Sequence, residues 1–142
     1  MATYKAPLRE LAFVTENVLD YDQLNRDIPQ FADFDASLRA SVTEEAAKFL
    51  ETRVAPLNQS GDKEGCKYAD KVVTTPKGFK EAYTDFWQAG WLALPLAAEY
   101  GGQGMPYSTY KLVEEMLSTS NIAFSLYSGL TQGAFESIEA WG

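Results

Sequence analysis

The sequence predicts an all-α fold, a bundle of about four or five helices. Along four segments, apolar residues recur at intervals of three and four, which is the period of one helix face. Prolines and glycines separate these segments, as expected at helix ends. Alternating or β-branched runs typical of strands are almost absent. With 142 residues, the chain is long enough for one domain with a sizeable core.

The first 34 residues are predicted to be an extension that carries a short helix. Residues 1–7 look extended, and Pro7 suits the first turn of a helix. Residues 20–34 are polar and interrupted by Pro29, which predicts a linker with about one turn. The main domain is therefore predicted over residues 35–142. Within residues 8–19 the expected apolar face consists of Leu8, Leu11, Ala12, Val14 or Thr15, Val18 and Leu19.

The longest helix is predicted to begin after Asp35, which is a good N-cap, and to continue to Pro56. Residues 58–68 contain several turn formers and are predicted to be a surface loop, while residues 72–74 are predicted to be briefly extended. The apolar face of the helix consists of Leu38, Val42, Ala46, Phe49, Leu50 and Val54.

The next helix is predicted to start at Thr75, as N-cap, with Pro76 in the first turn, and to end at Gly90. Its aromatic residues recur at helical spacing. We interpret this stripe as core rather than as a cofactor site, because each ring buries a large area. The stripe consists of Phe79, Tyr83, Phe86 and Trp87.

Two further helices complete the predicted bundle. One begins at Pro106 and is broken by the polar residues 118–121, and its apolar face consists of Tyr110, Val113, Met116 and Leu117. The last covers residues 122–141. Its small residues, Gly129, Gly133 and Ala134, would let the backbone of another element approach closely.

The connection over residues 91–106 holds two prolines and three glycines, which indicates a fixed, irregular path. Gly101-Gly102-Gln103-Gly104 fits either a tight turn or a close approach of the backbone to a ligand. The segment lacks the Gly-Lys-Ser/Thr ending of a phosphate-binding loop, and no predicted strand precedes it as a dinucleotide site requires. A structural turn is the interpretation that the pattern alone favours.

Composition excludes several classes of function. A formal charge of −8 argues against nucleic acid or an anionic membrane as the main partner. The sequence has no histidine, so Ser-His, Cys-His and zinc sites are not expected. Cys66 is the single cysteine and is interpreted as an ordinary thiol of a reducing compartment. No signal peptide or membrane span is predicted, and a cytoplasmic protein is expected.

Two pairs of adjacent glutamates, Glu44-Glu45 and Glu114-Glu115, are the next candidates for a site. Neighbouring carboxylates on a helix point about 100° apart and cannot share one proton as a catalytic pair would. We interpret both pairs as solvated faces.

Several segments together resemble the N-terminal helical domain of the acyl-CoA dehydrogenases. In that family a helix ends in Gly-Trp, an apolar segment follows, and a Tyr-Gly-Gly-x-Gly turn leads into a helix that carries Glu-Glu. The resemblance covers about residues 35–142, and it agrees in both sequence and spacing. The matching segments are Gly90-Trp91 with the run to Pro95, Glu99-Tyr100-Gly101-Gly102-Gln103-Gly104-Met105, Val113-Glu114-Glu115-Met116, and residues 121–133.

Residues 4–14 and 121–134 also resemble one branch of the family, which includes the 3-methylmercaptopropionyl-CoA dehydrogenases. The family fold continues with a β-domain and a C-terminal helical bundle, which hold FAD together with a neighbouring subunit. The resemblance implies that a glutamate of the C-terminal bundle removes the α-proton of an acyl-CoA while the β-hydrogen leaves as hydride. We therefore expect FAD in the complete enzyme, none in this chain alone, and no catalytic residue here.

The resemblance also implies that this domain supplies one wall of the acyl pocket. By position, Phe124, Ser128 and Gln132 match residues that line the end of the acyl chain, and their spacing places them on one helix face. The alternative is that this face packs inside the domain. We favour the pocket, because Ser128 and Gln132 are poor core residues unless they are hydrogen-bonded.

Two classes of function remain open. The first is the N-terminal piece of an acyl-CoA dehydrogenase, inactive alone, whose partners are the acyl-CoA substrate and the rest of the enzyme. The second is a self-standing helical interaction module without catalysis. The chain ends at Gly142, where the family's β-domain is expected to begin. We also expect a homo-oligomer, and self-association of the isolated chain through residues 107–116 or 122–141.

Overall fold

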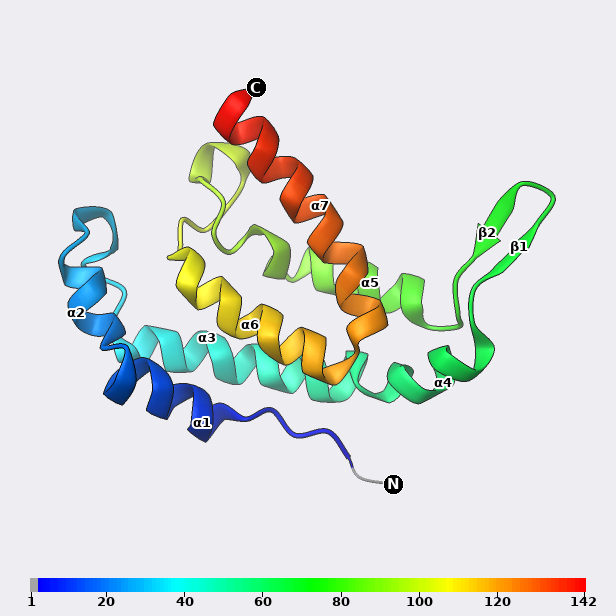
Figure 1. Cartoon of the computed structure of the whole chain (residues 1–142), viewed down its shortest axis with the longest axis horizontal. Helices are drawn as coiled ribbons and strands as arrows, with labels where there is room; N and C mark the ends of the chain where they lie inside the picture. Colours follow the sequence, from blue (N-terminus) through cyan, green and yellow to red (C-terminus); the bar gives the residue numbers. More distant parts are fainter. Residues whose placement is uncertain (1–2) are drawn as a thin grey trace.

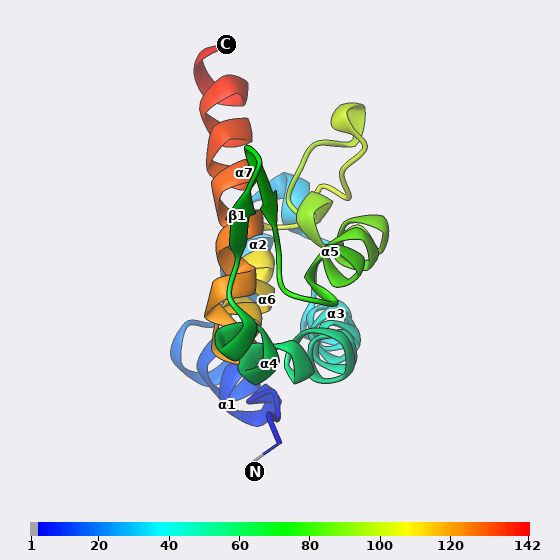
Figure 2. The same cartoon turned by 90° about the vertical axis from the view of Figure 1, so that its right-hand side faces the viewer.

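The computed structural model describes residues 3–142, and within them the fold is all-α with one small hairpin (Figure 1). Helix α3 (Ala36–Phe49) and α1 (Leu8–Phe13) lie along one side, α6 (Tyr107–Ser120) packs on α3, and α7 (Ile122–Trp141) packs on α6. The hairpin of β1 (Lys67–Ala69) and β2 (Val72–Thr74) projects from the side that faces the viewer in Figure 2. The α-helices are α1 (Leu8–Phe13), α2 (Tyr21–Arg26), α3 (Ala36–Phe49), α4 (Pro56–Glu64), α5 (Phe79–Gln88), α6 (Tyr107–Ser120) and α7 (Ile122–Trp141).

Shorter elements connect these helices. Strands β1 (Lys67–Ala69) and β2 (Val72–Thr74) pair antiparallel, with Tyr68 opposite Val73. The predicted extended segment at 72–74 is thus confirmed, and its partner lies within the predicted loop. Two π-helical segments, η1 and η3, and three 3₁₀ segments, η2, η4 and η5, complete the chain. They cover, in that order, Val14–Val18, Leu50–Val54, Pro29–Phe31, Trp91–Ala93 and Ala98–Tyr100.

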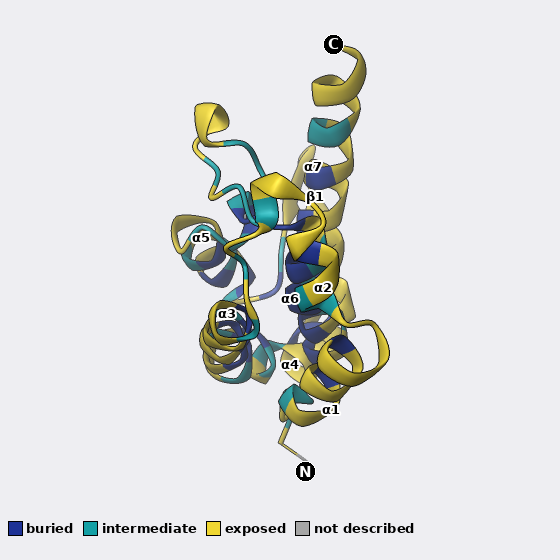
Figure 3. Cartoon of the chain, turned by 90° about the vertical axis from the view of Figure 1, so that its left-hand side faces the viewer, coloured by how far each residue is buried: buried dark blue, intermediate teal, exposed yellow. Residues whose placement is uncertain are grey.

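The core lies between α3, α5, α6 and the start of α7, as the side view coloured by burial shows (Figure 3). The predicted face of α6 is confirmed. The aromatic stripe of α5 is confirmed at Phe79 and Phe86, whereas Trp87 is 62% exposed. The largest fully buried side chains of the core are Tyr110, Phe86, Phe124, Leu50, Leu94, Met116 and Leu117.

The predicted loop over residues 58–68 is wrong in its first half, because α4 runs to Glu64. Pro56 occupies the first turn of α4, where its missing N–H has no cost. Gly61 is buried, and a Cβ there would lie 2.4 Å from Cε2 of Phe79. This glycine therefore makes room for a ring inside a helix rather than ending one. At the next helix, Gly78 with φ 87° is the N-cap of α5 in place of the predicted Thr75.

The extension packs on the main domain through α1, and Leu11 belongs to the common core. Of the predicted face, Leu11 and Thr15, the alternative to Val14, are buried, whereas Ala12, Val14, Val18 and Leu19 are exposed. The π-helical turns of η1 explain this difference, because a wider turn shifts which residues point inward. The end of the extension is held by Asp35, which caps α3 as predicted by accepting from the N–H of Leu38.

Residues 3–6 fasten the chain start to two helices. The hydroxyl of Tyr4 donates to the carbonyl of Met116 at 3.0 Å, and the N–H of Ala6 donates to the Glu51 carboxylate at 3.0 Å. Lys5 pairs with the same carboxylate at 2.7 Å, and its hydrogen bond lowers the pKa of Glu51. The predicted break after α6 is narrower than expected, since α6 continues to Ser120 and Asn121 alone separates it from α7.

Candidate functional site

The buried face of α7 carries the three residues that the sequence singles out. Phe124, Ser128 and Gln132 are 0%, 1% and 7% exposed, so all three face the interior of the domain. The ring of Phe124 lies 5.8 Å from that of Phe79 and 6.1 Å from that of Phe86, between centroids. Phe124 is therefore a core residue of the isolated chain.

Ser128 follows on the same face and has its hydrogen-bonding need met within α7. Its Oγ donates to the carbonyl of Ser125 at 2.9 Å. A buried hydroxyl that bonds within its own helix is tolerated at little cost. Its burial therefore requires no partner from outside the helix.

Gln132 differs from the other two because it borders a hollow of about 280 Å³. The hollow lies between α7, the start of α6 and the segment that follows η4. The amide of Gln132 donates to the carboxylate of Glu136 at 3.2 Å, one turn further along α7. Besides Gln132, the hollow is lined by Pro95, Leu96, Tyr107, Glu136 and Glu139.

Across the hollow from α7, the lining consists of apolar Pro95 and Leu96 and the polar side chain of Tyr107. Burial raises the pKa of the Tyr107 hydroxyl; its hydrogen bond to Lys111 opposes this shift and its bond to Glu136 adds to it. Lys111 lies 4.9 Å from the centre of the Tyr107 ring and pairs with Glu114, and this hydrogen bond raises the pKa of Lys111. The sequence reasoning missed Tyr107 and Glu136. The spacing of four between Gln132 and Glu136 was the available signal.

The glycine-rich turn closes on itself. Its backbone N–H groups are used internally: Gly102 donates to Ala97 O at 3.0 Å, Gln103 to Ala93 O at 3.0 Å, and Gly104 to Leu96 O at 2.9 Å. Gly101 and Gly104 have positive φ. A Cβ at Gly102 would lie 1.9 Å from Leu96 O. The turn is therefore structural, with no row of free N–H groups to hold a phosphate.

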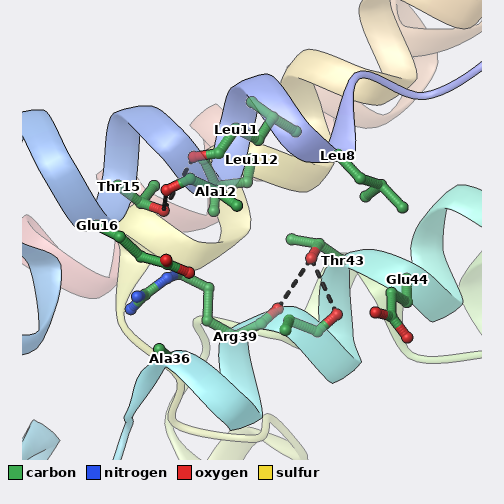
Figure 4. Close-up of a pocket in the computed structure, with 11 residues that line it drawn as sticks. Leu8, Leu11, Ala12, Thr15, Glu16, Ala36, Arg39, Thr43, Glu44 and Leu112 are labelled. Carbon is green, nitrogen blue, oxygen red and sulfur yellow. Dashed lines mark hydrogen bonds between the residues drawn. The ribbon is translucent and has the colours of Figure 1, made fainter.

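A second pocket, of about 90 Å³, lies between α1 and α3 (Figure 4). Arg39 at its end is 5% exposed and pairs with Asp22 at 3.0 Å, which ties α2 to α3. Among residues 3–142, Nη1 of Arg39 has no hydrogen-bond partner. The hydroxyls of Thr15 and Thr43 bond to carbonyls of their own helices. Of the residues considered as site candidates, this pocket contains Glu44 and none of Phe124, Ser128 and Gln132.

Two larger hollows, of about 560 and 420 Å³, flank the hairpin and share Phe79 and Tyr127. Cys66 is exposed, and its Sγ lies 3.7 Å from the hydroxyl of Tyr127. Burial raises the pKa of Tyr127, and the hydrogen bond with Cys66 raises it further.

Each of the two glutamate pairs contributes a surface ion pair. Glu45 pairs with Lys48, and Glu114 pairs with Lys111. Within the described part of the chain, none of the helices is both long and apolar enough to cross a membrane.

Comparison with known proteins agrees with this fold. The family described as acyl-CoA dehydrogenase, N-terminal domain, matches residues 39–142. The chain is also similar to a 3-methylmercaptopropionyl-CoA dehydrogenase of Ruegeria pomeroyi, with 30% identity over 140 residues. That alignment covers 99% of this chain and 24% of the relative. The chain thus spans about a quarter of the length of the curated relative that it matches.

Proposed function

Because the chain belongs to the N-terminal domain family of the acyl-CoA dehydrogenases, we propose that it is the N-terminal part of a flavin-dependent member of that family. The complete enzyme would remove hydrogens from the α and β carbons of an acyl-CoA thioester. The similar dehydrogenase, in which this chain matches 24% of the length, supports the proposal. Residues 1–34 are proposed as an extension and residues 35–142 as the helical domain.

Acyl-CoA dehydrogenases generally bind FAD, but the residues described here do not fit a flavin site. The glycine-rich turn spends its N–H groups on its own carbonyls. The strands among residues 3–142 form a single exposed hairpin rather than a sheet that leads into a helix. We propose that FAD is bound by other parts of the complete enzyme, and that this chain is inactive alone.

The contribution proposed for this chain is one wall of the acyl pocket, formed by Phe124, Ser128 and Gln132. The observation that carries it is the place of Gln132, whose buried amide borders a hollow beside Glu136. Phe124 and Ser128, which are fully buried on the same helix face, would hold Gln132 in place by their packing. Polar Gln132, the one of the three that borders the hollow, would shorten the pocket and favour a short or polar acyl chain.

A substitution at Gln132 tests the wall in the complete enzyme. Gln132→Ala removes the amide and enlarges the pocket, so kcat/KM for longer acyl-CoA substrates is expected to rise by about tenfold relative to short ones. Thr131→Ala, at an exposed neighbour, serves as the matched control and keeps the wild-type profile. An unchanged chain-length profile in Gln132→Ala would overturn the assignment.

We also propose that the isolated chain self-associates through α7. The structure buries most of the apolar residues of α6, so α7 is the better candidate of the two predicted surfaces. Its exposed large apolar residues are Ile122, Leu126, Leu130, Ile138 and Trp141. Sedimentation at increasing concentration should show oligomers, and the double substitution Leu126→Glu/Leu130→Glu should return a monomer. A wild-type chain that stays monomeric at high concentration contradicts this.

The exposed apolar face of α7 also supports the second candidate function, a helical interaction module without catalysis.

The visible absorbance of the purified chain tests the proposal that this chain binds no flavin. We expect no bound flavin in the 142-residue chain, and stoichiometric FAD would contradict our account. In either case we propose a cytoplasmic protein, as the single cysteine suggests.

A further inference from the structure

We propose that Asn121 is a positioning residue for the wall of the acyl pocket. It stands alone between α6 and α7 and is 1% exposed. Its side chain fixes the start of α7 against η3 and so sets where Gln132 lies. This inference rests on the proposed function, because the wall is defined there.

Asn121 uses every hydrogen-bonding group that it has. Its Oδ1 caps α7 by accepting from the N–H of Phe124 at 3.1 Å, and its Nδ2 donates to the carbonyl of Val54 at 3.4 Å. Its own N–H donates to Leu117 O at 3.0 Å, and its carbonyl accepts from Ser125 N–H at 3.1 Å. One side chain and its backbone therefore join η3, α6 and α7.

The junction of η3 and α4 explains why the carbonyl of Val54 accepts from a distant residue. In a regular α-helix this carbonyl would accept from the N–H of Asn58. Here the N–H of Asn58 donates to Ala55 O at 3.1 Å, and the N–H of Ala55 donates to Leu50 O at 2.8 Å. Pro56, between them, has no N–H. Because Asn58 bonds to Ala55 instead, the carbonyl of Val54 is left as an acceptor at the point where α7 begins.

Because α7 is a straight lever between Asn121 and Gln132, a small tilt of the helix at Asn121 moves Gln132 by a larger distance. Gln132 lies eleven positions beyond Asn121, which corresponds to about 16 Å along the helix. A tilt of about 5° at Asn121 would move Gln132 by about 1.4 Å. A shift of that size at the end of a binding pocket is comparable to one carbon–carbon bond of the acyl chain. The tether to Val54 therefore bears on the length of chain that the pocket accepts.

Two substitutions separate the two interactions of the Asn121 side chain: the tether, which is the hydrogen bond to Val54 O, and the cap, which is the hydrogen bond from Phe124 N–H. Asn121→Ser keeps a side-chain oxygen that can cap α7 but is too short to reach Val54. Asn121→Ala removes both interactions. Asp35→Ala is the matched control, because it removes an N-cap of similar strength from α3, far along the chain from α7. If Asn121 only stabilised the fold, Asn121→Ser would do no more than Asp35→Ala.

The test is steady-state kinetics of the complete flavoenzyme with acyl-CoA substrates of increasing chain length. Asn121→Ser is expected to change the ratio of kcat/KM between long and short substrates by about tenfold, chiefly through KM, while Asp35→Ala leaves the ratio unchanged. If Gln132→Ala alters the ratio and Asn121→Ser does not, the positioning role is wrong and the wall stands. If neither alters it, the wall itself is wrong.

Hydrogen exchange on the 142-residue chain supplies a readout that does not depend on activity. We expect the amides of residues 124–128 to exchange several-fold faster in Asn121→Ser than in wild type, and at the wild-type rate in Asp35→Ala. Equal protection of these amides in Asn121→Ser and wild type would overturn the positioning role.

Discussion

Helices α6 and α7 follow each other directly, yet they use their apolar residues in opposite ways. α6 buries seven of its 14 residues, whereas α7 buries four of its 20. The buried four lie in the first eleven residues of α7, and the C-terminal end of the helix projects beyond the other elements (Figure 1). Apart from Phe124, the large apolar residues of α7 therefore lie outside the core of the described chain. This exposed face is the one through which we propose self-association.

The largest effect should come from paired leucine substitutions in the two helices. Leu117 in α6 is 1% exposed and Leu130 in α7 is 77% exposed. Leu117→Ala is expected to lower the free energy of unfolding by about 2–5 kcal/mol, because it leaves a cavity. Leu130→Ala should change it by less than about 0.5 kcal/mol. Urea denaturation followed by circular dichroism measures both, and equal losses would contradict the comparison.

Substitutions at two glycines should change the free energy of unfolding by intermediate amounts and with opposite signs. Gly61→Ala places a methyl group against the ring of Phe79 and should destabilise the chain by about 1–3 kcal/mol. Gly133→Ala meets no heavy atom within 4 Å and should stabilise α7 by about 0.5–1 kcal/mol. Thermal unfolding of the monomeric chain gives the sign of each change. A loss at Gly133 would mean that something packs on the open face of α7.

The smallest effect at neutral pH concerns the buried tyrosine of α6. Burial raises the pKa of Tyr110 from 10.0 to about 12, so the folded chain holds this proton more tightly than the unfolded chain does. The resulting stability is fully present below pH 10 and is lost as pH rises from about 10 to 12. Tyr110→Phe should remove this part of the alkaline loss. A pH series of urea midpoints tests it, and identical slopes in both proteins would refute it.

The periodicity of the sequence was sufficient to predict the helices with strong apolar faces. α3, α5 and α6 were identified because apolar residues repeat every three to four positions along them. Asp35 was identified as a cap because its side chain needs only the local N–H of Leu38. α4 was missed, because Gly61 appears as a loop signal and only the three-dimensional contact with Phe79 explains it. Trp87 was placed in the core because rings usually pack, but it is 62% exposed.

The site was predicted less completely than the fold. The spacing of Phe124, Ser128 and Gln132 correctly placed them on one face, and their role in the pocket stays a prediction. Glu136 lies one turn from Gln132 on α7, whereas Tyr107 comes near them through the packing of α6 against α7. Asn121 was predicted as part of the break after α6. Its hydrogen bond to Val54 was missed, because the two residues are 67 positions apart in the chain. Local pattern carries no information on such contacts.

The turn at residues 101–104 has a consequence for mutational tolerance. Its shape is held by backbone hydrogen bonds, so exposed side chains such as that of Gln103 contribute little to it. At Gly102 any side chain would collide with a main-chain carbonyl that cannot swing aside. A saturation library over these positions should accept many residues at Gln103 and glycine alone at Gly102. The absence of a Cβ at Gly102 therefore allows the path that the chain takes from α5 to α6.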